Sequence, residues 1–412
     1  MSDSAAVRAG GFRAIAISTL VAGLLGYAIT TVAARGLGPD EYADFSSFWG
    51  MQYLLVGTFG GLQQEFSRAV SPTASPTGAP RVTSRFAVAG AGVAALVSLA
   101  VVSVAGPIVF AEGVAGFGAP LLVGLALYAV VAVYSGVMYG ISAWRVLAVV
   151  IVADPLLRLA GIAIVLLAGG GATSAVWASV VPYLVVLGIL VGTMMRGTGS
   201  AFAVDVGPAR LAANAARTVG AAVGVSVLVS GLPLLVGLAR GEASASSVGV
   251  LVFVLILTRA PLVLAVLSLQ SYLIVRLRDG GGRVGALLAV GVVAAGAALA
   301  LAGYLVGSPV IEAIAGPRYA VDPVVVAVLV ASSVATALLG VTGAVVLARS
   351  RHGVYVAGWT IAAAMSALLM FVLPGTLETR VAAALAVGPL LGLAVHALAL
   401  LRPGPGQANV AA

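Results

Sequence analysis

The chain alternates between long apolar runs and short connections that carry most of its charged side chains. Apolar segments of about 20 residues, the length that crosses roughly 30 Å of hydrocarbon as a helix, recur from Phe12 to Leu401. We predict spans over residues 12–34, 45–65, 86–111, 117–140, 145–168, 174–195, 216–239, 246–273, 284–307, 321–348, 353–373 and 379–401. The pattern therefore predicts an all-α integral membrane protein with about 12 transmembrane helices.

The amino-acid composition excludes several classes of protein. Hydrophobic residues make up 61% of the chain and charged residues 8%, whereas a soluble domain has about 25% charged residues. The absence of cysteine removes disulfides and thiolate metal sites. No connection is long enough for a catalytic domain outside the membrane, and no nucleotide-binding or metal-binding motif is present, so we expect neither an enzyme nor a cofactor.

The arginines lie mainly in the connections between the predicted spans. With the amino terminus in the cytoplasm, fifteen arginines fall on the cytoplasmic side and four on the other, while two lie within spans; the four are Arg35, Arg240, Arg318 and Arg380. This bias predicts a multi-pass membrane protein with both termini in the cytoplasm. We expect the membrane to be the plasma membrane of a bacterium. The net charge of +8 is thereby explained by topology, and no nucleic-acid partner is expected.

A weak internal repeat divides the spans into two sets of six. Arg13 and Arg35 flank the first span at a separation of 22 residues, and Arg217 and Arg240 flank the seventh at 23. We expect a six-helix lobe over residues 1–195, a cytoplasmic linker over 196–216 and a second lobe over 217–412. Six spans per half predict a pseudo-two-fold axis along the membrane normal, with a substrate pathway between the lobes.

Arg259 is the first candidate functional residue, because a charge at bilayer depth is costly and usually marks a pathway or a buried pair. It lies mid-way along the eighth predicted span, beside Pro261, which should loosen the helix. A fixed cation at this depth is suited to an anionic substrate group. The alternative is structural: the guanidinium caps carbonyls that the proline leaves free.

Asp154 and Arg158 lie four residues apart in the fifth predicted span and therefore on one helical face. Two interpretations stay open. The residues form an internal ion pair, or Asp154, the one acid predicted near mid-membrane, takes part in ion coupling.

A polar group ends the second predicted span. Gln63, Gln64, Glu65 and Arg68 are candidates for contact with a polar head group at the cytoplasmic mouth, and Gln270 is the counterpart at the end of the eighth span. The same residues would also serve as an interfacial anchor.

Aromatic side chains and histidines receive simpler interpretations. Six aromatic residues mostly suit the aromatic belts at membrane interfaces: Trp49, Tyr53, Trp144, Trp177, Tyr183 and Trp359. His352 and His396 have no partner at metal-ligand spacing, so no metal site and no role is assigned to them.

The first connection carries a family resemblance. It reads Gly-Leu-Gly-Pro-Asp-Glu-Tyr-Ala-Asp over residues 36–44, and an aromatic span that ends Gly-Leu-Gln-Gln-Glu follows it. This resembles the Wzx-type polysaccharide flippases of the multidrug/oligosaccharidyl-lipid/polysaccharide exporter superfamily, with Ala43 where the family usually has glycine. The motif covers only about thirty residues, while the span count fits along the whole chain.

The resemblance implies alternating access that moves an undecaprenyl-diphosphate-linked saccharide from the inner to the outer leaflet for cell-surface polysaccharide. It also implies that Arg259 lies on the cavity wall, with Asp154 and Arg158 deeper in one lobe. The expected partners are a lipid-linked anionic saccharide, membrane lipids, and glycosyltransferases or a polymerase of the same pathway; coupling to H⁺ or Na⁺ stays open. The alternatives are a multidrug exporter of the same fold and, with less support, a membrane-embedded polymerase or glycosyltransferase.

Overall fold

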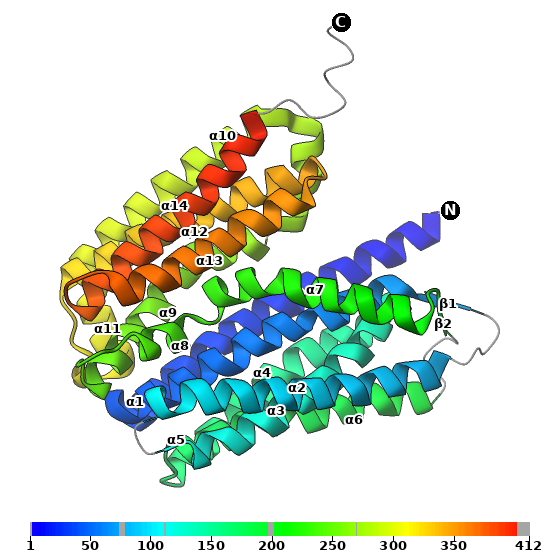
Figure 1. Cartoon of the computed structure of the whole chain (residues 1–412), viewed down its shortest axis with the longest axis horizontal. Coiled ribbons are helices and arrows are strands. Elements are labelled where there is room, and N and C mark those ends of the chain that lie inside the picture. Colours follow the sequence, from blue (N-terminus) through cyan, green and yellow to red (C-terminus); the bar gives the residue numbers. More distant parts are fainter. Residues whose placement is uncertain (1, 74–78, 111–112, 197–201, 269, 402–412) are drawn as a thin grey trace, which may run out of the picture. The chain divides into compact units, whose positions relative to one another are not determined.

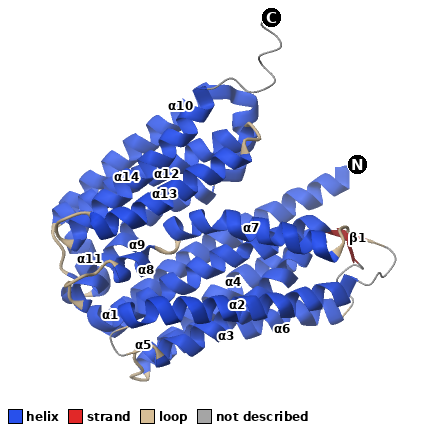
Figure 2. Cartoon of the chain, viewed as in Figure 1, coloured by secondary structure: helices blue, strands red, loops and turns tan. Residues whose placement is uncertain are grey.

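The computed structural model describes the backbone of residues 2–73, 79–110, 113–196, 202–268 and 270–401. Side chains are described over the same residues except 2–13, 260, 261, 264, 265, 267, 268 and 270–284. Within these residues the chain is helical almost throughout, as Figure 2 shows. It divides into two compact units, residues 1–226 and 227–412, which are described separately.

The amino-terminal unit contains seven α-helices and two short strands among its described residues. These are α1 (Ser2–Ala69), β1 (Val70–Pro72), α2 (Ala79–Val109), α3 (Ala115–Gly140), α4 (Trp144–Leu167), α5 (Ala172–Val180), α6 (Pro182–Met195), β2 (Phe202–Val204) and α7 (Pro208–Val229). The α7 helix crosses the unit boundary in its last turn. The α3, α4 and α6 helices pack together through side chains that include Met138, Leu147 and Leu190.

The α1 helix contains the first two predicted spans. Its apolar part runs over Ala14–Ala69, 56 residues, or about 84 Å of helix, which is far more than one bilayer crossing needs. At Gly38 the backbone leaves the helix, with φ 75° and ψ 171°, a conformation that glycine adopts without a Cβ clash. Figure 1 shows the chain turning back there, so that α1 begins and ends toward the same side of the unit.

A small sheet joins two segments that lie far apart in the sequence of the amino-terminal unit. β1 pairs antiparallel with β2, with Ser71 opposite Ala203. The Ser71 hydroxyl donates to Oδ1 of Asp205 at 2.8 Å, and the Asp205 amide donates to the Ala69 carbonyl at 2.8 Å. The segment expected as a linker over 196–216 is thus partly regular structure, since it contains β2 and the first turns of α7.

The carboxy-terminal unit consists of helices in its described part. These are α8 (Leu232–Leu238), α9 (Ala245–Ser268), α10 (Gln270–Ala302), a π-helical stretch (Gly303–Gly307), α11 (Ser308–Ala315), a 3₁₀ turn (Pro317–Tyr319), α12 (Pro323–Ala348), α13 (His352–Val372) and α14 (Leu377–Leu401). Its core includes Leu262, Val292 and Val341, and α12, α13 and α14 lie side by side (Figure 1).

The all-α membrane fold is confirmed. Ten described helical stretches are long and apolar enough to cross a membrane; α1 contributes a second crossing beyond Gly38, and α9 holds a shorter apolar stretch, Ala245–Arg259. Large apolar side chains such as Leu20, Val104 and Leu167 are exposed, as lipid-facing residues are. The chain is a multi-pass membrane protein.

Two predicted boundaries are wrong. The seventh span was expected to be continuous over 216–239, but it is divided into α7 and α8, because the helix stops before Gly231 and restarts with Pro233 near its first turn. The connection expected after residue 273 is helical, since α10 begins at Gln270. The polar residues of this segment had indicated a loop. They include arginines, however, and arginine has a high helix propensity.

Candidate functional site

Asp154 and Arg158 form an ion pair inside the amino-terminal unit. Nη2 of Arg158 donates to both carboxylate oxygens of Asp154, at 2.7 and 3.0 Å, and Nη1 donates to the Ser179 carbonyl. The Arg158 side chain is 0% exposed and that of Asp154 is 25% exposed. Both residues lie on α4, so the i,i+4 spacing seen in the sequence brings them together.

Aromatic rings surround the same guanidinium. Its central carbon lies 4.8 Å from the ring centroid of Tyr183 and 5.8 Å from those of Trp49 and Tyr53. At these separations a desolvated cation is stabilised by the π electrons. The rings of these three residues, which were predicted to lie in interfacial belts, pack on Arg158 within the amino-terminal unit.

Gln52 completes this arrangement. Its Nε2 donates to the Tyr183 hydroxyl at 3.4 Å, and its Oε1 accepts from the Ser179 hydroxyl at 3.3 Å. Gln52 is fully buried. The Arg158 charge is therefore balanced by a carboxylate of α4 and held by neutral groups from α1, α5 and α6.

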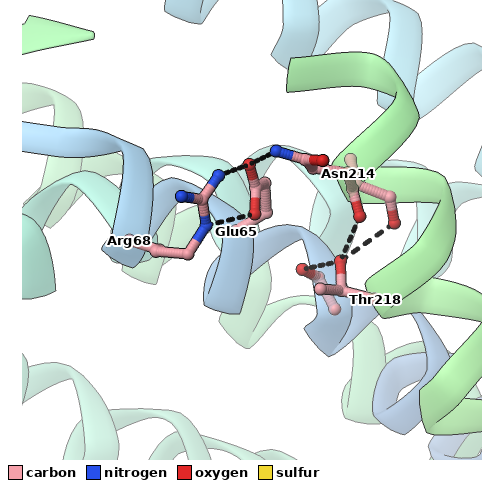
Figure 3. Close-up of polar contacts among 6 residues, drawn as sticks. Glu65, Arg68, Asn214 and Thr218 are labelled. Carbon is pink, nitrogen blue, oxygen red and sulfur yellow. Dashed lines mark hydrogen bonds and ion pairs between the residues drawn. The ribbon is translucent and has the colours of Figure 1, made fainter. Parts of the chain in front are cut away.

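A second polar cluster lies where α1 ends (Figure 3). Glu65, with 2% of its side chain exposed, accepts from Arg68 Nε at 2.9 Å and Nη2 at 2.5 Å. Its Oε1 also accepts from Nδ2 of Asn214, on α7, at 3.0 Å. Arg68 is 57% exposed, so a buried carboxylate orients a cation that remains accessible.

The neighbouring turn of α7 packs directly on α1. The Thr218 hydroxyl donates to the Gly61 carbonyl at 3.0 Å. A Cβ on Gly61 would lie 2.5 Å from the Val219 amide nitrogen, so the close approach of the two helices requires glycine. The α7 helix is thereby fixed to α1 by side-chain and backbone contacts.

Two other predicted residues of the amino-terminal unit, Gln63 and Gln64, lie beside this cluster. Gln63 is half-buried and Gln64 exposed, and the Gln63 backbone packs on Gly136 of α3. The Gln270 side chain lies outside the described residues. The structure thus brings Glu65 and Arg68 together and leaves the two glutamines beside them.

Arg259 lies in the carboxy-terminal unit, on α9, and is 6% exposed. Its Nη2 donates to the Thr336 hydroxyl on α12 at 3.0 Å. Its Nη1 is buried and has no hydrogen-bond partner within the described part of the chain. The two ion pairs found among the described residues involve other arginines. Arg259 is therefore a buried cation that lacks a carboxylate partner there.

The first connection has a structural role on the opposite end of the amino-terminal unit. Oε2 of Glu41 accepts a 2.8 Å hydrogen bond from the Ala172 amide at the start of α5. A carboxylate at this position satisfies a free backbone N–H and interacts favourably with the helix dipole. Glu41 of the first connection thus caps the first turn of a helix that begins 131 residues later.

Sequence reasoning missed the partners that lie far away in the chain. Nothing in the sequence around Asn214, Thr218 and Thr336 indicated that they contact distant residues. The i,i+4 spacing of Trp49 and Tyr53 placed them on one helical face but did not indicate which residue they pack on. No group of three or more metal-ligating side chains is found in the described residues.

Comparisons with known proteins support both the family and the fold. No family model matches the chain. An uncharacterized protein of Mycobacterium tuberculosis, Rv3630, is 31% identical over 408 residues, which are 97% of this chain and 94% of that protein. A second uncharacterized protein of the same organism, Rv1510, is 30% identical over 410 residues, covering 96% and 91%.

Solved structures of transporters share the fold. An inward-facing multidrug resistance MATE family transporter of the MOP superfamily matches with a TM-score of 0.68 at 14% identity, covering 93% of this chain and 98% of that one. The lipid II flippase MurJ in an inward closed conformation matches with a TM-score of 0.66 at 11% identity, covering 94% and 87%. The chain therefore has the two-lobed all-α fold of these transporters.

Proposed function

The chain belongs to one family with the mycobacterial proteins Rv3630 and Rv1510, and from that premise we propose that it is an alternating-access transporter of the plasma membrane. Its fold supports this proposal, because proteins of that fold include a multidrug transporter and a lipid flippase. In the proposed mechanism two six-helix lobes, residues 1–195 and 217–412, alternately open to the two sides of the membrane.

The proposed cargo is an undecaprenyl-diphosphate-linked saccharide, moved from the inner to the outer leaflet. The observation that carries an anionic cargo is Arg259, whose buried Nη1 has no partner among the described residues. An unpaired buried charge is costly, and a diphosphate would supply both the missing acceptor and the missing negative charge. Arg158 is not expected to bind an anionic cargo, since Asp154 already neutralises its charge.

The lipid-linked nature of the cargo is supported by the first connection, which resembles that of the Wzx-type flippases, and by the match to MurJ. A diphosphate-sugar does not cross hydrocarbon unaided, because each charge loses several kcal/mol or more of hydration. A cationic group at bilayer depth offsets part of that cost.

The cluster at the end of α1 suits the first contact with the head group. Arg68 is exposed and held in place by Glu65, with Gln63 and Gln64 beside it. In this proposal the arginine meets the diphosphate at the cytoplasmic mouth before Arg259 does. Glycosyltransferases would supply the lipid-linked unit, and a polymerase would use it on the outer side.

Deletion of the gene tests this proposal. We expect the lipid-linked saccharide to be made normally and to accumulate in the inner leaflet, and we expect a wild-type copy on a plasmid to restore its export. Loss of the lipid-linked unit itself would favour a biosynthetic enzyme. A strain with normal surface polysaccharide but increased sensitivity to cationic drugs would favour multidrug export.

A further inference from the structure

A histidine is buried between three helices of the carboxy-terminal unit. His396, on α14, is 0% exposed. Its ring stacks on that of Tyr355 on α13, with centroids 6.4 Å apart and planes 12° apart. A Cβ on Gly358 would lie 2.2 Å from its Nε2. The α13 helix therefore has room for the imidazole only because this position is glycine.

Both ring nitrogens face hydrogen-bonding groups. Nδ1 lies 3.0 Å from the Thr342 hydroxyl on α12, and Nε2 lies 3.5 Å from the Tyr355 carbonyl. The Thr342 oxygen is also 3.1 Å from the carbonyls of Leu338 and Leu339. The hydroxyl can therefore donate either to Nδ1 or to its own helix, whereas the Tyr355 carbonyl can only accept.

These contacts satisfy two protonation states in one geometry. In the neutral state, Nε2–H donates to Tyr355 and Nδ1 accepts from Thr342. In the charged state, the Thr342 hydroxyl rotates to the Leu338 or Leu339 carbonyl, and its oxygen accepts from Nδ1–H. One proton is added to Nδ1, and no heavy atom has to move. Imidazole is the side chain whose ordinary titration lies between about pH 5 and 8.

We propose that His396 is a proton-binding site, and that proton uptake there is the ion coupling of the transporter. The coupling part rests on the proposed function; the proton site itself does not. The helices that meet at His396 include α12, which also holds the Thr336 partner of Arg259. Charging His396 places a cation between α13 and α14, two helices that are otherwise closely packed, and so biases their packing.

The charged groups around the site are arginines at the nearby helix ends. Arg349, after α12, donates to the Leu400 carbonyl at 3.4 Å, and Arg351, before α13, donates to the Ala399 carbonyl. Tyr355 is the titratable group that faces the ring from α13. Neither ion pair found among the described residues includes His396. Uptake of a proton therefore adds a net charge, which makes the step sensitive to the membrane potential and to the position of the helices.

Histidine NMR tests the proton site directly, since the chain has only two histidines. In the full-length protein with ¹⁵N-labelled histidine in lipid nanodiscs, His352 is exposed and serves as the internal reference. We expect both nitrogens of His396 to become protonated between about pH 5 and 8. Thr342→Val should lower the midpoint by about one pH unit, because it removes the acceptor for the charged state. A His396 that remains one neutral tautomer across this pH range overturns the proposal.

Export as a function of pH tests the coupling. His396→Gln should make export independent of external pH while the protein remains inserted. Ser366→Ala is the matched control, because it removes another hydrogen bond between α13 and α14, to the Ala384 carbonyl, and should leave the pH dependence intact. A pH profile of His396→Gln equal to that of the wild type overturns the coupling. The NMR titration needs no cargo, so failure of the proposed cargo does not affect its outcome.

Discussion

The guanidinium of Arg259 on α9 is held by the hydroxyl of Thr336 on α12, through a hydrogen bond of 3.0 Å. Threonine is neutral, so this contact positions the cation without neutralising it. Arg158 differs in its contacts. Its guanidinium donates to the Asp154 carboxylate and the Ser179 carbonyl, and it packs against three aromatic rings. Both arginines were predicted to lie within a span, but only Arg158 has a carboxylate partner among the described residues. We therefore propose a structural role for Arg158 and anion binding for Arg259.

The Asp154–Arg158 pair predicts an asymmetry between single and double variants. Asp154→Leu should destabilise the protein by about 3 kcal/mol, because it leaves a fully buried guanidinium unpaired. The double variant Asp154→Leu/Arg158→Met should recover most of that loss, since an apolar replacement removes both charges. Thermal unfolding in detergent measures both. Equal destabilisation by the single and double variants would show that the pair is not the source of the effect.

Glu65 predicts a local effect on α7. Glu65→Ala removes the acceptor of both Asn214 and Arg68, and we expect the first turns of α7 to lose about 1–2 kcal/mol of local stability. Hydrogen exchange of amides 209–217 should accelerate accordingly. Arg68→Ala is the comparison, since it removes the exposed cation but leaves the hydrogen bond from Asn214 to Glu65 in place. Unchanged exchange in Glu65→Ala would mean that Gly61 and Thr218 alone hold α7.

Glu41 predicts that an acid of the first connection stabilises α5. Glu41→Ala should cost about 1 kcal/mol through loss of the capping hydrogen bond, seen as a lower midpoint of thermal unfolding. Asp40→Ala, at an adjacent exposed acid, should leave the midpoint unchanged. If the two variants behave alike, the effect reflects the net charge of the connection and not the bond to Ala172.

The arginine distribution predicts the orientation in the membrane. The chain has no cysteine, so one introduced cysteine reports the side of the membrane on which that position lies. Asp40 and Arg81 are suitable positions because both are exposed. A membrane-impermeant maleimide added to intact cells should label Asp40→Cys, and it should label Arg81→Cys only after lysis. Labelling of both positions in intact cells would contradict the topology.

Apolar periodicity was sufficient to predict the membrane fold, because lipid requires each spanning segment to satisfy its own backbone as a helix. The turn between the first two spans was also visible, as glycine and proline meet at Gly38 and Pro39. The division of the seventh span was not predicted, since its apolar run continues through Gly231. The regular structure of the expected linker was missed because β1 and β2 pair across about 130 residues.

The candidate site was predictable only where its members share one helix. Asp154 with Arg158, and Glu65 with Arg68, follow from spacing along a helix. The aromatic rings around Arg158 and the contacts of Asn214 and Thr336 depend on how helices pack, which periodicity does not encode. For the same reason no role could be assigned to His396 from the sequence, since its partners Thr342 and Tyr355 come from two other helices.

Translocation in purified vesicles tests the central claim, that Arg259 binds the anionic head group of a lipid-linked cargo. The protein is reconstituted with a fluorescent polyprenyl-diphosphate saccharide, and its movement between leaflets is followed by quenching from outside. We expect rapid movement with the wild type, none above protein-free vesicles with Arg259→Ala, and partial movement with Arg259→Lys, which keeps the charge but not the planar fork. Wild-type rates with a folded, inserted Arg259→Ala would contradict the account and make Arg259 a helix-packing residue.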